Sequence, residues 1–241
     1  MDNTLDYILS KQLNHAFASS EFLTIQASVF GASGLARLLL AASIVALWFF
    51  RPLSETYKFR YRALLILITL LPTYLAARIV QHIFTRPRPI GVMPLEIVGD
   101  PEVWRAWKDG IEQAGSFPSD HAALFFIFVT VLWSLNRKIG IISLALAAYF
   151  CMLRVVLGFH WSSDILGGAA LGYLVATLIL KFEQPLKGYL HHIVNWVESR
   201  RALCYSIAFI FLADLACGFD LFLEGIVFKL LKIFLHIGPL H

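Results

Sequence analysis

The residues of this chain that could do chemistry gather in three short stretches, and one of them runs from Arg154 through His160 to Asp164. His160 and Asp164 are four residues apart, so on a helix they would share one face and the carboxylate would reach an imidazole nitrogen. Such a carboxylate fixes the tautomer and stabilises the imidazolium, which leaves the other nitrogen as a nucleophile. The alternative is a pair that merely satisfies two polar groups near lipid headgroups. The nearby Arg154, whose guanidinium can fork two phosphoryl oxygens, favours a catalytic role.

The second stretch, Pro118-Ser119-Asp120-His121, lies where a long polar loop gives way to an apolar run. A helix that begins at Pro118 or Ser119 would point its free N–H groups and the positive end of its dipole at an anion. Ser119 would either cap that helix or hydrogen-bond the anion, and His121 places an imidazole in the first turn. The alternative is an ordinary helix cap followed by a polar interfacial histidine.

The third stretch is Thr85-Arg86-Pro87-Arg88-Pro89. Its two prolines stiffen a segment that leaves the membrane and hold the arginines at a helix end. Arginines in this position are commonly lipid anchors, and one of the two fits that role. Anchoring alone does not readily explain the rigid Arg-Pro-Arg-Pro pattern.

Composition indicates the elements that position these stretches. The chain has 241 residues, 59% of them hydrophobic and 15% charged, with a mean hydropathy of +0.71. Long apolar runs predict an all-α polytopic membrane protein, because lipid admits only helices or closed barrels and these runs are too long for barrel strands. The net charge of +4 reflects basic loops and indicates no nucleic-acid partner. The three cysteines lie in apolar runs without metal-ligand spacing, and no removable signal peptide is evident at the N-terminus.

We expect a bundle of about six transmembrane helices. Clusters of Lys and Arg mark 51–62, 137–138 and 181–201 as cytoplasmic, so loop 85–118, with Trp104 and Trp107 on a short helix at the headgroups, is exterior. The outer ends of three spans then bring the three stretches to one face. The expected spans are 34–50, 63–84, 122–135, 139–157, 165–182 and 202–217. An amphipathic interfacial helix in 4–30 precedes them. A basic amphipathic stretch in 186–201 lies between the last two spans, and an apolar tail at 221–235 follows them.

We treat residues 1–241 as one membrane domain. It comprises an N-terminal amphipathic segment (1–33), a catalytic core (63–182) and a C-terminal extension (186–241).

In this order the three stretches resemble the type 2 phosphatidic acid phosphatase superfamily, whose signature is K-x-x-x-x-x-x-R-P, then P-S-G-H, then S-R-x-x-x-x-x-H-x-x-x-D. The likeness spans residues of about 63 to 182. It implies that His160 is the nucleophile, that Asp164 orients it, and that His121 is the general acid and base. It also implies that the phosphate is bound by the remaining positions of the motifs, namely Arg88, Arg154, Ser119, Gln81 and Asp120.

Three positions depart from the family pattern. Gln81 stands where the family has Lys and supplies no charge, so Arg78 or Arg86 would have to compensate. Asp120 replaces the family Gly, and Leu153 replaces a Ser. Similar P-S-D-H variants occur among bacterial undecaprenyl diphosphate phosphatases of the superfamily.

The resemblance therefore implies an integral lipid phosphatase of the cell membrane that hydrolyses undecaprenyl diphosphate at the exterior face. The reaction would run through a phosphohistidine, without a cofactor or a metal. Alternative substrates are phosphatidic acid, phosphatidylglycerol phosphate and lipid A, and a lipid phosphotransferase would use the same His160. Two non-enzyme alternatives are a transporter and an inactive scaffold. The transporter is disfavoured because few ionisable groups lie at the midplanes of the spans, whereas Gln81 is the best argument for the scaffold.

Overall fold

The computed structural model describes residues 4–31, 34–50, 56–96 and 115–217. Every regular element in these ranges is a helix, which confirms the predicted all-α class. Trp104, Trp107 and the apolar tail at 221–235 lie outside the described residues. In chain order the helices are α1 (Leu5–Ala18), α2 (Glu21–Gln26), the π-helix η1 (Ala27–Gly31), α3 (Leu35–Phe49), α4 (Thr56–Ile83), α5 (Pro89–Val92), α7 (Asp120–Leu135), α8 (Arg137–Val156), α9 (Ser162–Ser199) and α10 (Arg201–Ala216).

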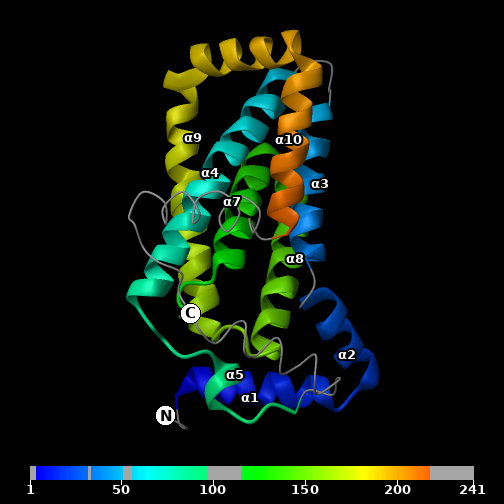
Figure 1. Ribbon diagram of the computed structural model, residues 1–241, viewed down its shortest axis with the longest axis vertical. Coiled ribbons are helices and arrows are strands. Elements are labelled where there is room, and N and C mark those ends of the chain that lie inside the picture. The colour runs from blue at the N-terminus through cyan, green and yellow to red at the C-terminus, as the bar shows by residue number, and fades with distance from the viewer. Residues whose placement is uncertain (1–3, 32–33, 51–55, 97–114, 218–241) are drawn as a thin grey trace, which may run out of the picture.

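Helix α7 forms the centre of the bundle and packs against α4, α8 and α9 (Figure 1). It is apolar on all sides, with Leu124, Ile127 and Val131 among its buried residues, as expected for a helix surrounded by others. Helix α3 packs against α4 and α10. Because α7 begins and α8 ends at the lower end of the bundle in Figure 1, the motifs attached to those ends meet there.

Close packing of α7 on α9 depends on two glycines of α9. A Cβ atom at Gly168 would collide with the carbonyl oxygen of Ser119, and one at Gly172 would collide with that of Ala123. Small residues four apart allow two helix backbones to approach closely, a common device in membrane helices. This contact sets the first turn of α7 against the first turns of α9.

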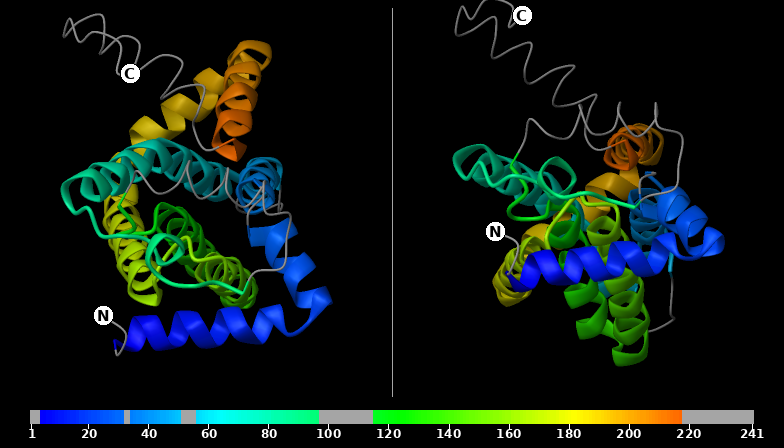
Figure 2. Two further views of the ribbon diagram at one scale, coloured as in Figure 1. Left: turned by 60° about the horizontal axis from the view of Figure 1, so that its bottom comes forward. Right: turned by 90° about the horizontal axis from the view of Figure 1, so that it is seen from below.

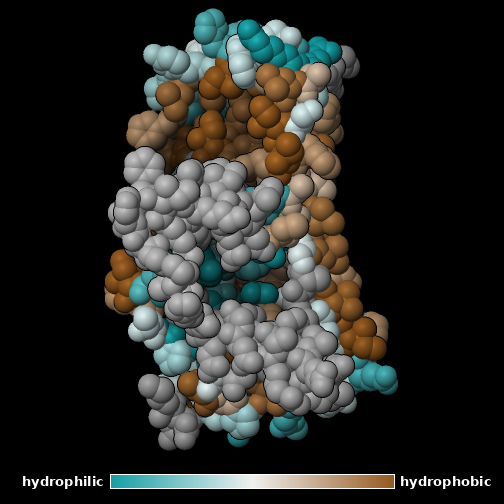
Figure 3. Space-filling model, viewed as in Figure 1, coloured by the Kyte–Doolittle hydropathy of each residue, from teal (hydrophilic) through white to brown (hydrophobic). Residues whose placement is uncertain are grey.

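Three helices, α4, α8 and α9, are long and apolar enough to cross a membrane, and α2, η1 and α3 would supply a fourth as one bent span. Helix α7 is apolar but shorter, with 16 residues. Figure 3 shows an apolar band over the upper bundle, a hydrophilic rim above it, and a hydrophilic recess lower down. The all-α membrane bundle agrees with the sequence analysis, whereas the number of six spans remains a prediction.

Helix α9 differs from expectation. We expected a span at 165–182 and a separate amphipathic stretch at 186–201, but one helix of 38 residues covers both, with Pro185 inside it. A proline removes one helical hydrogen bond and kinks a helix without necessarily ending it. Past the proline, α9 turns across the upper end of the bundle (Figure 1). Leu190 and Val194 are buried in the main core and hold this part in place.

The N-terminal segment forms two helices where we expected one. The helix breaks at Ser19 and Ser20, and α1 lies across the lower end of the bundle, where α7 and α9 begin and α8 ends (Figure 2). Its inward face is mixed, because Ser10 and Asn14 are buried and Leu13 and Phe17 pack on a small hydrophobic cluster at the end of α8. Leu5 is 73% exposed.

Candidate active site

Three segments converge at the lower end of the bundle, and Arg88 ties them together. Its Nη1 donates to the carbonyl oxygen of Phe159 at 2.7 Å, and its Nη2 donates to that of Gly115 at 3.0 Å. Arg88 follows α4, Gly115 precedes α7, and Phe159 lies between α8 and α9. The three stretches that the sequence analysis expected at one face are therefore adjacent.

His160 lies in the loop that follows α8. Gly158 adopts a φ of +71°, a left-handed conformation that favours glycine and lets the chain turn after the helix. The Nδ1 of His160 lies 2.8 Å from the carbonyl oxygen of Ser116. A carbonyl only accepts hydrogen bonds, so Nδ1 carries the proton and Nε2 of the neutral ring keeps its lone pair. Burial, together with the charges of Arg88 and Arg154, holds the pKa of His160 well below its usual value, which keeps the ring neutral at pH 7.

Asp164 is placed differently from our expectation. His160 precedes α9, so the two residues do not share a helix face, and Nδ1 of His160 is 3.9 Å from Oδ2 of Asp164. The carboxylate instead closes the capping box of α9, where Oδ2 accepts from the Trp161 amide at 2.7 Å. Its Oδ1 accepts from Nη1 of Arg86, also at 2.7 Å. The four-residue spacing of His160 and Asp164 predicts a shared helix, but the N-cap of α9 is Trp161, so the helix begins after His160.

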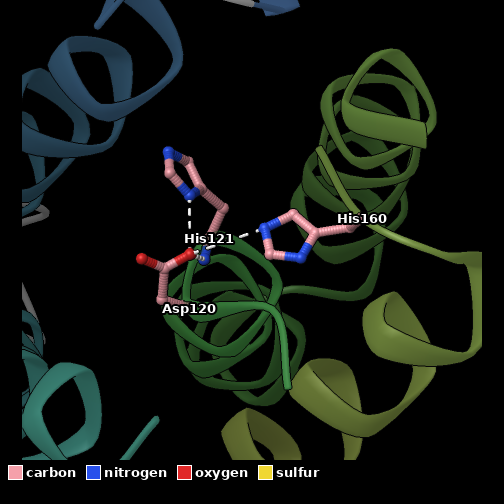
Figure 4. Close-up of side chains that lie close together, drawn as sticks. All are labelled: Asp120, His121 and His160. Carbon is pink, nitrogen blue, oxygen red and sulfur yellow. Dashed lines mark hydrogen bonds and ion pairs between the residues drawn. The ribbon is translucent and has the colours of Figure 1, made fainter. Parts of the chain in front are cut away.

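Asp120 lies between the two histidines (Figure 4). Its Oδ1 accepts from the backbone amide of His121 at 2.8 Å and from Nδ1 of the same residue at 2.9 Å. The same oxygen is 3.9 Å from Nε2 of His160. A carboxylate therefore occupies the space directly in front of the unprotonated nitrogen of His160.

The cluster also has the composition of a metal site. Asp120, His121 and His160 each offer one ligand atom, and these atoms lie within 4.8 Å of one another. The charges of Arg88 and Arg154 reach this cluster, because both lower the pKa of His160. Fixed cations around the group favour an anion there and oppose a divalent metal.

Arg154 projects from the last turn of α8. Its Nη1 donates to the carbonyl oxygen of Gly31 at 2.9 Å, and its guanidinium stacks over the ring of Phe159, with 4.2 Å from Cζ to the ring centroid. These two contacts fix the cation beside the loop that carries His160.

Gln81 is nearly fully buried, at 1% exposure. Its Nε2 donates to the carbonyl oxygen of Pro118 at 2.7 Å, and its Oε1 accepts from Nη1 of Arg78 at 3.1 Å. Burial lowers the pKa of the Arg88 guanidinium, Asp120 opposes that change, and the charge of Arg78 adds to it. Arg78 is therefore close enough to act electrostatically on the same site.

Of Arg78 and Arg86, the two cations expected to compensate for the missing family Lys, the structure favours Arg78. Arg86 donates to Asp164, and also to Ser163 and Asp6, so carboxylates already neutralise its charge. Arg78 donates instead to the neutral Gln81.

Ser119 takes the capping role of the two that we considered. It is the N-cap of α7, which begins at Asp120, and its Oγ accepts from the Ala122 amide at 3.4 Å. Its own amide donates to the carbonyl oxygen of Asp164 at 3.0 Å, which joins the start of α7 to the start of α9.

Several contributors were missed by the sequence analysis. The Ser116 carbonyl sets the tautomer of His160, the Trp161 indole donates to the Pro87 carbonyl, and Asp6 on α1 reaches Arg86. A backbone carbonyl leaves no signature in a sequence. Asp6 lies 158 residues before Asp164, so no spacing rule links the two.

Comparison with known proteins supports the family. Residues 62–187 match the PAP2 superfamily. The chain is 26% identical over 159 residues to "Bacitracin transport permease protein BcrC" of Bacillus licheniformis. This alignment covers 66% of this chain and 71% of that protein. It is 32% identical over 92 residues to "Lipid A 1-diphosphate synthase" of Escherichia coli K12, which covers 33% of this chain and 39% of that protein.

A third relative is "Putative undecaprenyl-diphosphatase YbjG" of Escherichia coli K12, 29% identical over 132 residues, or 52% of this chain and 58% of that protein. No solved structure matches the chain. Because the family match covers just over half of the 241 residues, the chain belongs to the PAP2 superfamily and is a membrane lipid phosphatase of that superfamily.

Proposed function

We propose that this protein removes the terminal phosphate of a lipid diphosphate, with undecaprenyl diphosphate as the preferred substrate and a phosphohistidine as the intermediate. The tautomer of His160 supports this proposal most directly. Its Nδ1 donates to the Ser116 carbonyl, so the unprotonated Nε2 faces Asp120, which also contacts His121. A neutral, oriented imidazole nitrogen is the nucleophile that a phosphohistidine mechanism requires.

The reaction has two steps. Nε2 of His160 attacks the terminal phosphorus, the bond to the leaving oxygen breaks, and His121 protonates that oxygen. His121 then takes a proton from a water molecule, which attacks the phosphohistidine, and inorganic phosphate leaves. Asp164, 3.9 Å from Nδ1 of His160, stabilises the positive charge that the ring gains in the first step.

The positive charges around His160 suit a phosphoryl group that is being transferred. Arg88 and Arg154 lie beside the His160 loop, Arg78 acts from α4, and the N-terminus of α7 adds the positive end of its helix dipole. Preorganised donors of this kind stabilise the charge that develops in the transition state. Asp120 must move aside or exchange its place with the incoming phosphate, because it stands 3.9 Å from Nε2.

The choice of a diphosphate rests on the relatives and on Asp120. Two relatives carry names that refer to diphosphates. A diphosphate releases a phosphate monoester, whose second pKa is about 6, so it needs less help from a general acid than an alkoxide does. A His121 that is already paired with Asp120 suffices for such a leaving group.

Two other activities have a specific observation in their favour. The relative named a lipid A 1-diphosphate synthase suggests phosphoryl transfer to a second lipid, with that lipid replacing water in the second step. The relative named a transport permease suggests transport. The cluster described above lies at one end of the bundle, whereas transport sites lie near the midplane.

A substrate panel tests the proposal. Purified protein in detergent should release inorganic phosphate from undecaprenyl diphosphate faster than from phosphatidic acid, phosphatidylglycerol phosphate or lipid A, without added metal. The variant His160→Ala is the matched control and should release none. Phosphate that appears only on an acceptor lipid would make the protein a transferase. No turnover of any lipid by correctly folded protein would contradict the proposal.

We also propose that the site faces the exterior of the cell membrane. Labelling with an impermeant thiol reagent tests this in a background where Cys151, Cys204 and Cys217 are changed to Ser. Lys11→Cys, on α1 at the site end, should label in intact cells, or in spheroplasts where an outer membrane exists. Lys138→Cys, at the other end of α8, should not. The reverse pattern would contradict the orientation.

A further inference from the structure

Helix α1 contacts the site through Asp6. Oδ2 of Asp6 accepts from Nη2 of Arg86 at 2.8 Å and from the hydroxyl of Ser163. Its Oδ1 accepts from the Ser163 amide at 3.0 Å. The first turn of α1 is thereby fixed to the first turn of α9, which carries Asp164.

Arg86 connects Asp6 to the carboxylate beside the nucleophile. One guanidinium nitrogen donates to Asp6 and the other donates to Asp164, at 2.8 and 2.7 Å. The side chain of Arg86 is 34% exposed, whereas that of Asp164 is fully buried. Without Asp6, the partly exposed Arg86 side chain would keep its bonds to Asp164 and Ser163 and its contact with the Trp161 ring, but it would lose the carboxylate that fixes its second nitrogen.

The charge state of Asp6 suits this contact. Burial by itself would raise the pKa of Asp6, but hydrogen bonds from Ser163 and Arg86 outweigh it and lower the pKa. Asp6 is therefore ionised at pH 7, and its pair with Arg86 is charge-assisted.

Further along the same face, Asn14 holds α1 on two other segments of the site end. Its Nδ2 donates to the Val156 carbonyl at 2.9 Å, where α8 ends. Its Oδ1 accepts from the Glu96 amide at 2.7 Å, in the segment after α5. Asp6 and Asn14 are eight residues apart and share one helix face. Helix α1 therefore joins the end of α8, the first turn of α9 and the segments that follow α4 and α5.

We propose that α1, which lies outside the family match at 62–187, is part of the active site, and that Asp6 is a positioning residue that holds Asp164 in place through Arg86. This inference rests on the proposed function, because the role of Asp164 is defined by the phosphohistidine reaction. A phosphoryl-transfer site tolerates little misplacement, since about 1 Å costs about 10²-fold in rate. Loss of the Asp6 carboxylate, which is distant from the motifs in sequence, should therefore lower kcat.

Kinetics of Asp6→Asn test the proposal. This variant keeps the size of the side chain but loses its charge and one acceptor oxygen. We expect kcat to fall about 10-fold with KM within about 2-fold, because the substrate does not touch Asp6. Asp6→Glu should recover part of the loss. Glu21→Gln, which removes an exposed acid from the neighbouring α2, is the matched control and should leave both constants unchanged.

Thermal unfolding supplies a second readout that needs no activity. The changes in Tm caused by Asp6→Asn and Arg86→Gln should be non-additive in the double variant, because the two residues share one contact. Additive changes, or an unchanged kcat in Asp6→Asn, would overturn the proposal. An inactive wild-type protein with non-additive changes would contradict the proposed function and leave the contact standing.

Discussion

His160 and His121 both approach Asp120, yet the surroundings of the two histidines differ. His160 is held by a backbone carbonyl, and the nearest carboxylate oxygens lie 3.9 Å from its ring nitrogens. His121 is held directly by Asp120, at 2.9 Å. The side chain of His160 is 1% exposed, and that of His121 is 12% exposed.

This difference separates two chemical tasks. A carbonyl fixes the tautomer without adding charge, so His160 stays neutral and nucleophilic. At His121, burial and Arg154 lower the pKa, and the carboxylate of Asp120 in direct contact opposes that fall, so this ring is better suited to exchange a proton. The two histidines are therefore not interchangeable, and their replacement should have different consequences.

The largest effect should come from replacing the nucleophile. His160→Ala should lower kcat by about 10⁵-fold or more, a scale typical of nucleophile knockouts, while the protein remains folded. Phosphate release and Tm in detergent measure both quantities. A variant that retains near-normal turnover would exclude His160 as the nucleophile.

The next largest effect should come from the general acid, and its size should depend on the leaving group. His121→Ala should lower kcat by about 10²- to 10⁴-fold. The loss in kcat/KM, which reports the first step alone, should be about 10-fold smaller on a lipid diphosphate than on phosphatidic acid, because the diphosphate releases a phosphate whose second pKa is about 6. Parallel kinetics on the two lipids measure the difference. Equal losses would mean that His121 does not protonate the leaving oxygen.

A smaller effect is expected at Asp120, which faces both histidines. Asp120→Gly removes a negative charge that stands 3.9 Å from Nε2 of His160. Inorganic phosphate should then inhibit about 10-fold more strongly, because an anion no longer meets a carboxylate. Asp120→Asn is the matched control that keeps the side-chain volume, and it should show the same gain. Unchanged inhibition in both variants would place the phosphate away from Asp120.

The smallest effect is expected on the α4 side, which lacks the family Lys. Arg78→Ala should lower kcat/KM about 10-fold or less, and Gln81→Lys should partly restore it by bringing a cation back. Gln81→Lys alone should change little, because Arg78 already supplies charge. Strictly additive effects in the double variant would mean that residue 81 does not act on the phosphate.

Sequence reasoning was sufficient for the elements and motifs that depend on local patterns. Apolar runs predicted the helices to within a few residues at α3, α8 and α10, and Ser119 was identified as a candidate cap. The three motifs were expected at one end, and Arg88 joins them there. Each of these depends on composition or on neighbours in the chain.

The parts that sequence reasoning missed depend on contacts between distant segments. The four-residue spacing of His160 and Asp164 suggested a shared helix, whereas the N-cap at Trp161 separates them. The partner of His160 is a carbonyl, which every residue possesses. The segments expected separately at 165–182 and 186–201 form one helix, because burial of Leu190 and Val194 holds the second half of α9 against the core.

A covalent trap tests the central assignment, which is that His160 carries the phosphoryl group. In His121→Ala, the first step on a diphosphate should persist because its leaving group needs little acid, while the second step loses the base that activates water. Substrate labelled with ³²P in the terminal phosphate should therefore label the protein, with an acid-labile and base-stable bond at His160. The double variant His121→Ala/His160→Ala should take up no label. Label on another residue, or none while phosphate is still released, would contradict the account.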